Sequence, residues 1–217
     1  MPGAPSFSAA GAEALVAAAL PLARGRAVVW DFDGVLADTE PLHAESYRTM
    51  LLDRGFAVAP DFFEELVGHT EAWIWDRLTE LNPSLGESTK ALLAEERRVR
   101  FLESALSSLS PSWIATSLVP AFDRHANGQT VVSNGNPDVI GTLLEAWGLG
   151  DRLAVARRAE GEDKRGLLVA RCASPALVLE DSAEFLRLAR SLGAATVGVA
   201  HEYNSGRGIE ADLLCTL

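Results

Sequence analysis

The amino-acid sequence predicts an α/β fold built on a parallel β-sheet, with a helical insertion after the first strand of the core. Short apolar runs that end in acidic or small polar residues recur along the chain, as expected of strands buried on both faces. Patterns with helical spacing lie between these runs, and such alternation forms parallel sheets through right-handed crossovers. Residues 41–110 break the alternation and carry only helical patterns.

Four apolar runs predict the strands of the sheet, and a fifth is weaker. The runs are residues 27–31, 130–133, 176–179 and 195–199, with 153–155 as the weaker candidate. The first run ends in Asp31, and the third is followed by Glu180 and Asp181. The last ends shortly before His201. The polar residues at the ends of these runs are the first candidates for a functional site.

Helix signals fill the intervals between the strands. Asn136 followed by Pro137 is typical of a helix start, and Gly148 ends that pattern. Ser182 begins a second helix that ends at Gly193. Residues 9–22 are apolar, but they contain an acid and lack a basic start, so we interpret them as an amphipathic helix and not as a leader peptide.

The helical insertion is large enough for a small lobe of its own. Its longest segment has apolar residues at three-or-four spacing, namely Leu92, Val99, Leu102, Leu106 and Leu109. We therefore predict a core domain of residues 1–40 and 111–217 and a helical cap domain of residues 41–110. Trp73, Ile74 and Trp75 are interpreted as packing of this lobe.

Composition limits the classes of partner. The net charge is −11, with 19 basic and 30 acidic residues, which argues against nucleic acid. No segment approaches the length of a membrane span. The two cysteines, Cys172 and Cys215, have no metal-binding or disulfide spacing. We expect a cytoplasmic monomer that attracts any anionic substrate by a local metal or helix end.

Acidic residues gather where parallel strands end, which is where ligands bind in such sheets. Asp31 and Asp33 are two residues apart on an extended segment, so both carboxylates face one site. Gly34 then allows the chain to turn sharply. A divalent cation would relieve the repulsion between the two acids, and Glu180 and Asp181 would complete an oxygen-rich Mg²⁺ site.

Phosphate is the anion that the remaining residues favour. Ser133 and Asn134 lie where a strand passes into a capped helix, and a hydroxyl with backbone N–H groups suits a phosphate. Lys164, before the helical stretch 166–172, would supply positive charge.

Set in this order, the motifs resemble the haloacid-dehalogenase-like superfamily. The segment Asp31-Phe32-Asp33-Gly34-Val35-Leu36-Ala37-Asp38-Thr39-Glu40 is similar to its nucleophile loop. Ser133-Asn134-Gly135 and Glu180-Asp181-Ser182 are similar to its second and fourth motifs. The resemblance covers residues 27–199 and is greatest for the branch with a helical cap, which includes phosphoglycolate phosphatases and β-phosphoglucomutase. It implies a Rossmann-like core.

The resemblance also implies a role for each residue. Asp31 would attack phosphorus and form an aspartyl-phosphate, while Asp33 would protonate the leaving alcohol and then activate water. Asp31, Asp33, Glu180 and Asp181 would hold Mg²⁺, with Asp33 contributing its carbonyl. Ser133, Asn134 and Lys164 would bind the phosphoryl oxygens. A small phosphate ester is the expected substrate.

Two parts of the pattern leave alternatives open. The third motif lacks the usual proline after Lys164, so Arg157, Arg158 or Arg165 could take its role. Gly68-His69-Thr70 lies where capped relatives carry a specificity loop, so His69 and Thr70 are candidate substrate residues, although a simple helix–helix turn fits equally well.

The expected activity is that of a Mg²⁺-dependent phosphatase, and three other functions compete with it. A sugar phosphomutase of the β-phosphoglucomutase type would carry an arginine in the cap loop, where this chain has Glu71. A dehalogenase would need neither Asp33 nor the second acidic pair. A poorly catalytic phosphate-binding regulatory module is favoured only by the irregular third motif.

Overall fold

The computed structural model describes residues 4–56, 62–65, 71–83, 85–159, 161–204 and 208–217. Its internal contacts divide the chain into two compact units. The first unit comprises Met1–Asp38 with Ser110–Leu217, and the second is Thr39–Leu109. The division falls near the sequence boundaries at residues 40 and 111, and each unit is described by itself.

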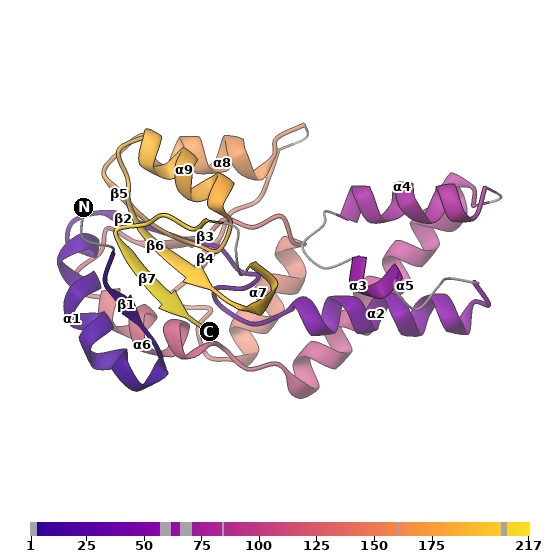
Figure 1. The fold of residues 1–217 in the computed structure, drawn as a ribbon, viewed down its shortest axis with the longest axis horizontal. Helices are drawn as coiled ribbons and strands as arrows, with labels where there is room; N and C mark the ends of the chain where they lie inside the picture. The colour runs from indigo at the N-terminus through magenta and orange to yellow at the C-terminus, as the bar shows by residue number, and fades with distance from the viewer. Residues whose placement is uncertain (1–3, 57–61, 66–70, 84, 160, 205–207) are drawn as a thin grey trace. The chain divides into compact units, whose positions relative to one another are not determined.

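The first unit alternates strands and helices along the chain (Figure 1). Its strands are β1 (Ser6–Phe7), β2 (Ala27–Trp30), β3 (Gln129–Val131), β4 (Ala154–Val155), β5 (Ala176–Glu180), β6 (Ala195–Ala200) and β7 (Leu213–Thr216). Its helices are η1 (Ala9–Gly11), α1 (Ala12–Ala23), α6 (Trp113–Phe122), α7 (Pro137–Ala146), α8 (Lys164–Arg171), α9 (Ala183–Ser191) and η2 (Glu202–Asn204).

The strands form one seven-stranded sheet in the order β1-β7-β6-β5-β2-β3-β4, and every neighbouring pair is parallel. Every residue of β5 is buried, as expected of a central strand covered on both faces. Helices α8 and α9 lie on one face of the sheet, and α1 and α6 on the other (Figure 1). The predicted α/β fold with a Rossmann-like parallel sheet is confirmed.

Two strands at one edge of the sheet were not predicted. β1 has two residues and pairs with β7 in parallel, with Ser6 opposite Leu214. The main-chain N–H of Leu214 also donates to the carbonyl of Pro5 at 2.8 Å. A two-residue strand contains no repeat of the period-two pattern, so β1 exists only because β7 offers it an edge.

The second unit contains only helices in its described part: α2 (Glu40–Asp53), α3 (Phe62–Glu65), α4 (Glu71–Leu81) and α5 (Glu87–Ser108). Its core is a set of buried apolar side chains from all four helices and the segment before α5, namely Tyr47, Met50, Leu51, Phe62, Phe63, Ile74, Leu78, Leu85 and Leu93. Trp73 and Trp75 pack against this cluster. They are therefore packing residues of the helical unit, as the sequence indicated.

Helix α5 was predicted from one apolar stripe but buries another. Leu92, Val99 and Leu106 are exposed. The buried stripe runs through Leu93, Arg97, Phe101 and Ala105 at spacings of four residues. Arg97 belongs to this stripe because its guanidinium pairs with Glu71 at 3.1 Å and lies over the ring of Tyr47 at 4.6 Å. Because the buried stripe contains a charged residue, a pattern of hydrophobic residues does not reveal this stripe.

Among the described residues, no helix combines the length and the apolarity of a membrane span. Cys172 and Cys215 are both buried free thiols, so the two cysteines of the chain form no disulfide.

Candidate active site

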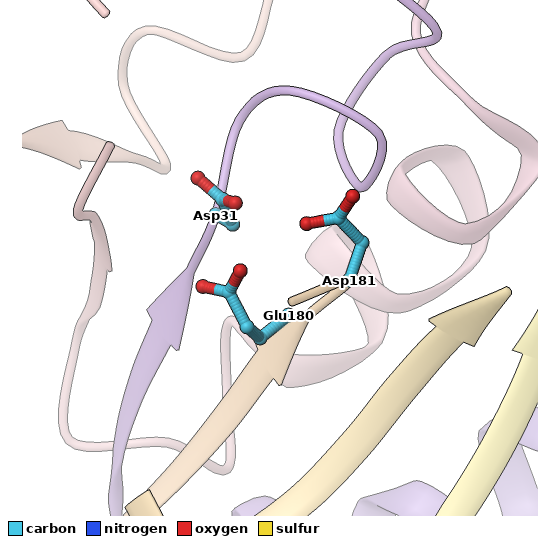
Figure 2. Close-up of side chains that lie close together, drawn as sticks. All are labelled: Asp31, Glu180 and Asp181. Atoms are coloured by element: carbon cyan, nitrogen blue, oxygen red, sulfur yellow. The ribbon is translucent and has the colours of Figure 1, made fainter. Parts of the chain in front are cut away.

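Three carboxylates meet where the central strands β2 and β5 end. The register pairs Trp30 with Leu179, which brings the next residues, Asp31 and Glu180, side by side. Asp181 follows directly. Figure 2 shows the carboxylates of all three residues turned toward a common space. The parallel register alone therefore assembles this acidic cluster from two segments that are far apart in the sequence.

The cluster has the chemistry of a magnesium site. Asp31, Glu180 and Asp181 each offer one oxygen, and these oxygens lie within 4.8 Å of one another. Asp31 and Glu180 are buried and Asp181 is half-buried. Mg²⁺ prefers hard oxygen ligands and keeps several waters, so a partly open group of three carboxylates fits it. The donor set contains no sulfur and no nitrogen.

Lys164 contacts two of these acids. It is the first residue of α8, whose N-cap residue Asp163 accepts a hydrogen bond from the N–H of Gly166 at 2.8 Å. Its Nζ is 2.8 Å from Asp31 Oδ2 and 2.8 Å from Glu180 Oε2, and the side chain is only 5% exposed. The lysine is thus a buried counter-charge shared by two acids.

Burial and mutual repulsion shift the titration of this group. The pKa of Asp31 is raised well above its usual value, first by burial and then by Glu180, although Lys164 opposes the shift. Burial also raises the pKa of Glu180, against the influence of Lys164. Burial disfavours the ammonium, but the charges of Asp31 and Glu180 outweigh it and raise the pKa of Lys164. The two negative charges therefore depend on a nearby cation.

The three arginines that could have replaced Lys164 have other partners. Arg157 pairs with Asp138 at 2.6 Å, and Arg165 pairs with Glu184 at 2.8 Å. Arg158 donates to the main-chain carbonyl of Asn134 at 3.0 Å. All three of these contacts are exposed.

Asp33 and Ser133 come together across the β2–β3 pair. The Ser133 hydroxyl donates to Asp33 Oδ2 at 3.3 Å and accepts from the N–H of Gly135 at 2.9 Å. Asp33 is also one of the acids that raise the pKa of Asp31, so the two aspartates share one electrostatic environment. Two of the three motifs are thus joined by a direct hydrogen bond.

Asn134 lies between Ser133 and the start of α7. That helix is capped by Asn136, whose side chain accepts from the N–H groups of Asp138 and Val139 at 2.9 and 3.3 Å. The Asn134 carbonyl is held by Arg158. The loop that bears Asn134 is therefore fixed at both ends, as the capping signal in the sequence indicated.

The turn after β2 requires glycine. Gly34 has φ +69°, a left-handed conformation that L side chains rarely adopt. A Cβ atom on Gly34 would lie 2.8 Å from Asp181 Oδ2 and 2.8 Å from His201 Nε2. The chain between Asp31 and Ala37 can therefore pass close to Asp181 only without a side chain at this position.

Two residues near the cluster were not predicted as site residues. His201 follows β6 and places Nε2 2.8 Å from Asp181 Oδ2. Asn204 is buried and donates to the main-chain carbonyls of Asp181 and Val199 at 3.1 and 2.9 Å. The sequence does contain a signal for His201, because this residue stands just beyond the end of a predicted parallel strand, where ligand-binding residues gather.

The candidate cap residues His69 and Thr70, with Gly68, lie outside the described residues. The structure brings together Asp31, Asp33, Ser133, Lys164, Glu180 and Asp181 in the first unit, with Asn134 in the adjoining loop.

Comparison with known proteins gives consistent results. The family model of haloacid dehalogenase-like hydrolases matches residues 26–207. A phosphorylated carbohydrates phosphatase from Thermotoga maritima is 28% identical over 213 residues, covering 84% of this chain and 89% of the relative.

Solved structures share the fold at lower identity. CbbY from Rhodobacter sphaeroides, solved with phosphate, has a TM-score of 0.66 and 19% identity, covering 87% of this chain and 92% of that one. β-Phosphoglucomutase from Clostridium difficile has a TM-score of 0.63 and 20% identity, covering 88% and 90%. Since the family model spans most of the sequence and the fold agrees, the chain belongs to the haloacid dehalogenase-like hydrolase family.

Proposed function

We propose that this protein is a Mg²⁺-dependent phosphatase that hydrolyses a small phosphate monoester, with Asp31 as the nucleophile. The observation that carries the proposal is the cluster of Asp31, Glu180 and Asp181, in which the buried ammonium of Lys164 pairs with Asp31 and Glu180. Its position at the carboxyl ends of β2 and β5 is where open parallel sheets bind ligands. Membership of a hydrolase family gives the reaction class.

The residues that would hold Mg²⁺ are Asp31, Asp181 and the main-chain carbonyl of Asp33, with Glu180 in or beside the ligand shell. When bound, the ion would neutralise charge on the phosphoryl oxygens and lower the repulsion between the carboxylates. Burial of Asp31 and Glu180, which raises the pKa of both acids, supports a requirement for this extra positive charge.

In the first step, a carboxylate oxygen of Asp31 forms a bond to phosphorus while the bond from phosphorus to the alcohol oxygen breaks. Asp33 gives its proton to the departing alkoxide. In the second step, Asp33 takes a proton from water, the water oxygen bonds to phosphorus, and the Asp31–phosphorus bond breaks. The hydrogen bond from Ser133 to Asp33 supports this role, because it orients the acid.

Ser133, the loop at Asn134 and Lys164 would bind the phosphoryl oxygens that do not react. The contacts of Lys164 with Asp31 and Glu180 support its assignment to the third motif despite the missing proline. They also count against a poorly catalytic binding module.

We infer that the helical unit Thr39–Leu109 is a cap that selects the alcohol part of the substrate, with His69 and Thr70 as candidate contacts. The name of the Thermotoga relative supports a phosphorylated carbohydrate as the substrate class. A cytoplasmic monomer remains our expectation for this enzyme.

The test is release of inorganic phosphate from a panel of sugar phosphates, phosphoglycolate, nucleotides and a chromogenic ester. We expect release with Mg²⁺, no release with chelator, and no release from Asp31→Asn. Asp33→Asn should keep metal binding but lose turnover, because only proton transfer is removed. Asp151→Asn, an isosteric change at an exposed residue, is the control and should match the wild type.

Other results would point elsewhere. Conversion of a sugar phosphate to its isomer without phosphate release would indicate a mutase. Release that survives Asp31→Asn would exclude Asp31 as the nucleophile.

A further inference from the structure

His201 and Asp181 form a partly buried contact that the proposed chemistry does not use. The Nε2 atom of His201 lies 2.8 Å from Asp181 Oδ2, and the histidine side chain is 9% exposed. His201 follows β6, whose residue Gly198 pairs with Glu180 of β5. The ring therefore reaches Asp181 from the neighbouring strand.

The chemistry of the pair fixes its direction. An ionised carboxylate only accepts hydrogen bonds, so the proton lies on His201 Nε2. Among the described residues, the buried Nδ1 of His201 has no hydrogen-bond partner. The N–H at Nε2 is thus directed at Asp181, and Nδ1 bonds to nothing else described. The carboxylate of Asp181 is therefore the hydrogen-bond partner of the ring among the described residues.

Asn204 fixes the backbone on which this contact depends. Its Oδ1 accepts from the N–H of His201 at 2.9 Å. Its Nδ2 donates to the carbonyls of Asp181 and Val199. One buried amide therefore links the end of β6, His201 and the residue after β5, so that His201 and Asp181 keep a fixed separation.

The turn at Gly34 encloses the same contact. A Cβ atom on Gly34 would lie 2.8 Å from both Asp181 Oδ2 and His201 Nε2. In Figure 2, one oxygen of Asp181 points toward the loop that follows Asp31, and the other points toward Asp31 itself. Oδ2, the atom next to Gly34, is thus held by His201 on the loop side.

We propose that His201 is a positioning residue for the metal site, which holds Asp181 Oδ2 and leaves Oδ1 as the oxygen that would bind Mg²⁺. This inference rests on the proposed function, in which Asp181 is a metal ligand. A carboxylate that is oriented before the metal arrives loses less side-chain entropy on binding. Mutation of a residue that hydrogen-bonds to a metal ligand commonly weakens the metal affinity about 10–100-fold.

The experiment measures binding of Mn²⁺, a paramagnetic substitute for Mg²⁺, by electron paramagnetic resonance titration of the full-length protein. The variants are His201→Ala, which removes the donor, and His201→Gln, whose amide nitrogen can occupy the position of Nε2. His125→Ala is the matched control, because His125 lies in the turn before β3, at the opposite end of the sheet. Thermal unfolding without metal is recorded for each variant.

We expect His201→Ala to weaken Mn²⁺ binding about tenfold or more, and His201→Gln to bind Mn²⁺ close to the wild-type affinity. His125→Ala should not change it. If His201→Ala fails to fold, His201→Asn replaces it, since this shorter amide cannot reach Asp181. Rescue by glutamine separates a hydrogen-bonding role from a structural one.

The results separate this inference from the proposed function. If the wild type binds Mn²⁺ and His201→Ala binds it with the same affinity, the inference about His201 is overturned while the proposed function stands. Equal weakening in His201→Ala and His201→Gln would also overturn it, because the hydrogen bond would not be the cause. A wild type that binds no Mn²⁺ would refute the metal site of the proposed function and this inference with it.

Discussion

Lys164 illustrates how one residue acquires its role from its surroundings. In the sequence it stands in a charged segment, Gly161-Glu162-Asp163-Lys164-Arg165, that reads like a solvated turn. In the structure it is the first residue of α8 and lies against Asp31 and Glu180. The Nζ atom of Lys164 also lies over the ring of Phe185, 4.4 Å from the ring centroid, and this contact shields the ammonium further. Burial therefore makes this cation a required partner of the acids.

Replacement of Lys164 by methionine should destabilise the metal-free protein, because it leaves two buried acids without their counter-charge. Loss of one member of a buried pair costs about 3–5 kcal/mol. The pKa values of Asp31 and Glu180 are already raised, so the folded state binds more protons than the unfolded state, and stability falls as pH rises through this window. Urea unfolding should therefore show a larger loss at about pH 8 than at about pH 5.

The other lysine of the chain provides the control for this prediction. Lys90 pairs with the exposed Glu87 at 2.8 Å within α5. Lys90→Met should change the free energy of unfolding by less than about 1 kcal/mol at either pH. Equal losses for the two variants, or a loss for Lys164→Met that does not depend on pH, would contradict the electrostatic explanation.

At the scale of elements, β2 is the strand that carries the site, and glycines in left-handed conformations stand before and after it. Gly25 has φ +68° and Gly34 has φ +69°. A Cβ on Gly25 would meet nothing within 4 Å, whereas one on Gly34 would meet Asp181 and His201. The two positions thus share backbone strain and differ in crowding at the candidate site.

This difference gives a paired prediction. Gly25→Ala should cost only the left-handed strain, about 1–2 kcal/mol of unfolding free energy, with normal phosphate release per folded molecule. Gly34→Ala should cost more and should reduce both Mg²⁺ affinity and turnover, because Asp181 must move. Urea unfolding and phosphate assays measure the two effects. Equal activity in the two variants would show that Asp181 tolerates displacement.

Helix α5 shows a limit of reading elements from sequence. The spacing of leucines predicted a helix correctly, but the side that is buried was decided by Arg97, Phe101 and Ala105. Periodicity reports that a helix has an apolar side. It does not report that a charged residue will be buried by an ion pair and a ring contact.

At the scale of the whole molecule, the helical unit is inserted into a core whose two segments meet at a defined point. The N–H of Ser112 donates to the carbonyl of Leu36 at 2.7 Å, and the Ser112 hydroxyl donates to that of Val35 at 2.7 Å. These bonds lie within the first unit and join the segments on either side of Thr39–Leu109.

We therefore predict that Thr39–Leu109 can be replaced by a short glycine–serine linker between Asp38 and Ser110. The shortened protein should unfold cooperatively and keep Mn²⁺ binding, because the described site residues belong to the first unit. Discrimination between sugar phosphates should be lost, while a small chromogenic ester should still be hydrolysed. Circular dichroism and the substrate panel measure these properties. An unchanged ranking of substrates would exclude a selective role for the helical unit.

The sequence alone determined the α/β class, the helices in the described part of residues 41–110 and the acids at the strand ends, because periodicity, capping residues and strand-terminal polar residues are local signals. Tertiary structure decided which basic side chain lies between Asp31 and Glu180, and that His201 and Asn204 reach Asp181. It also added β1 at the sheet edge. These contacts join segments separated by many residues, so they depend on sheet order and register, which no short window of sequence contains.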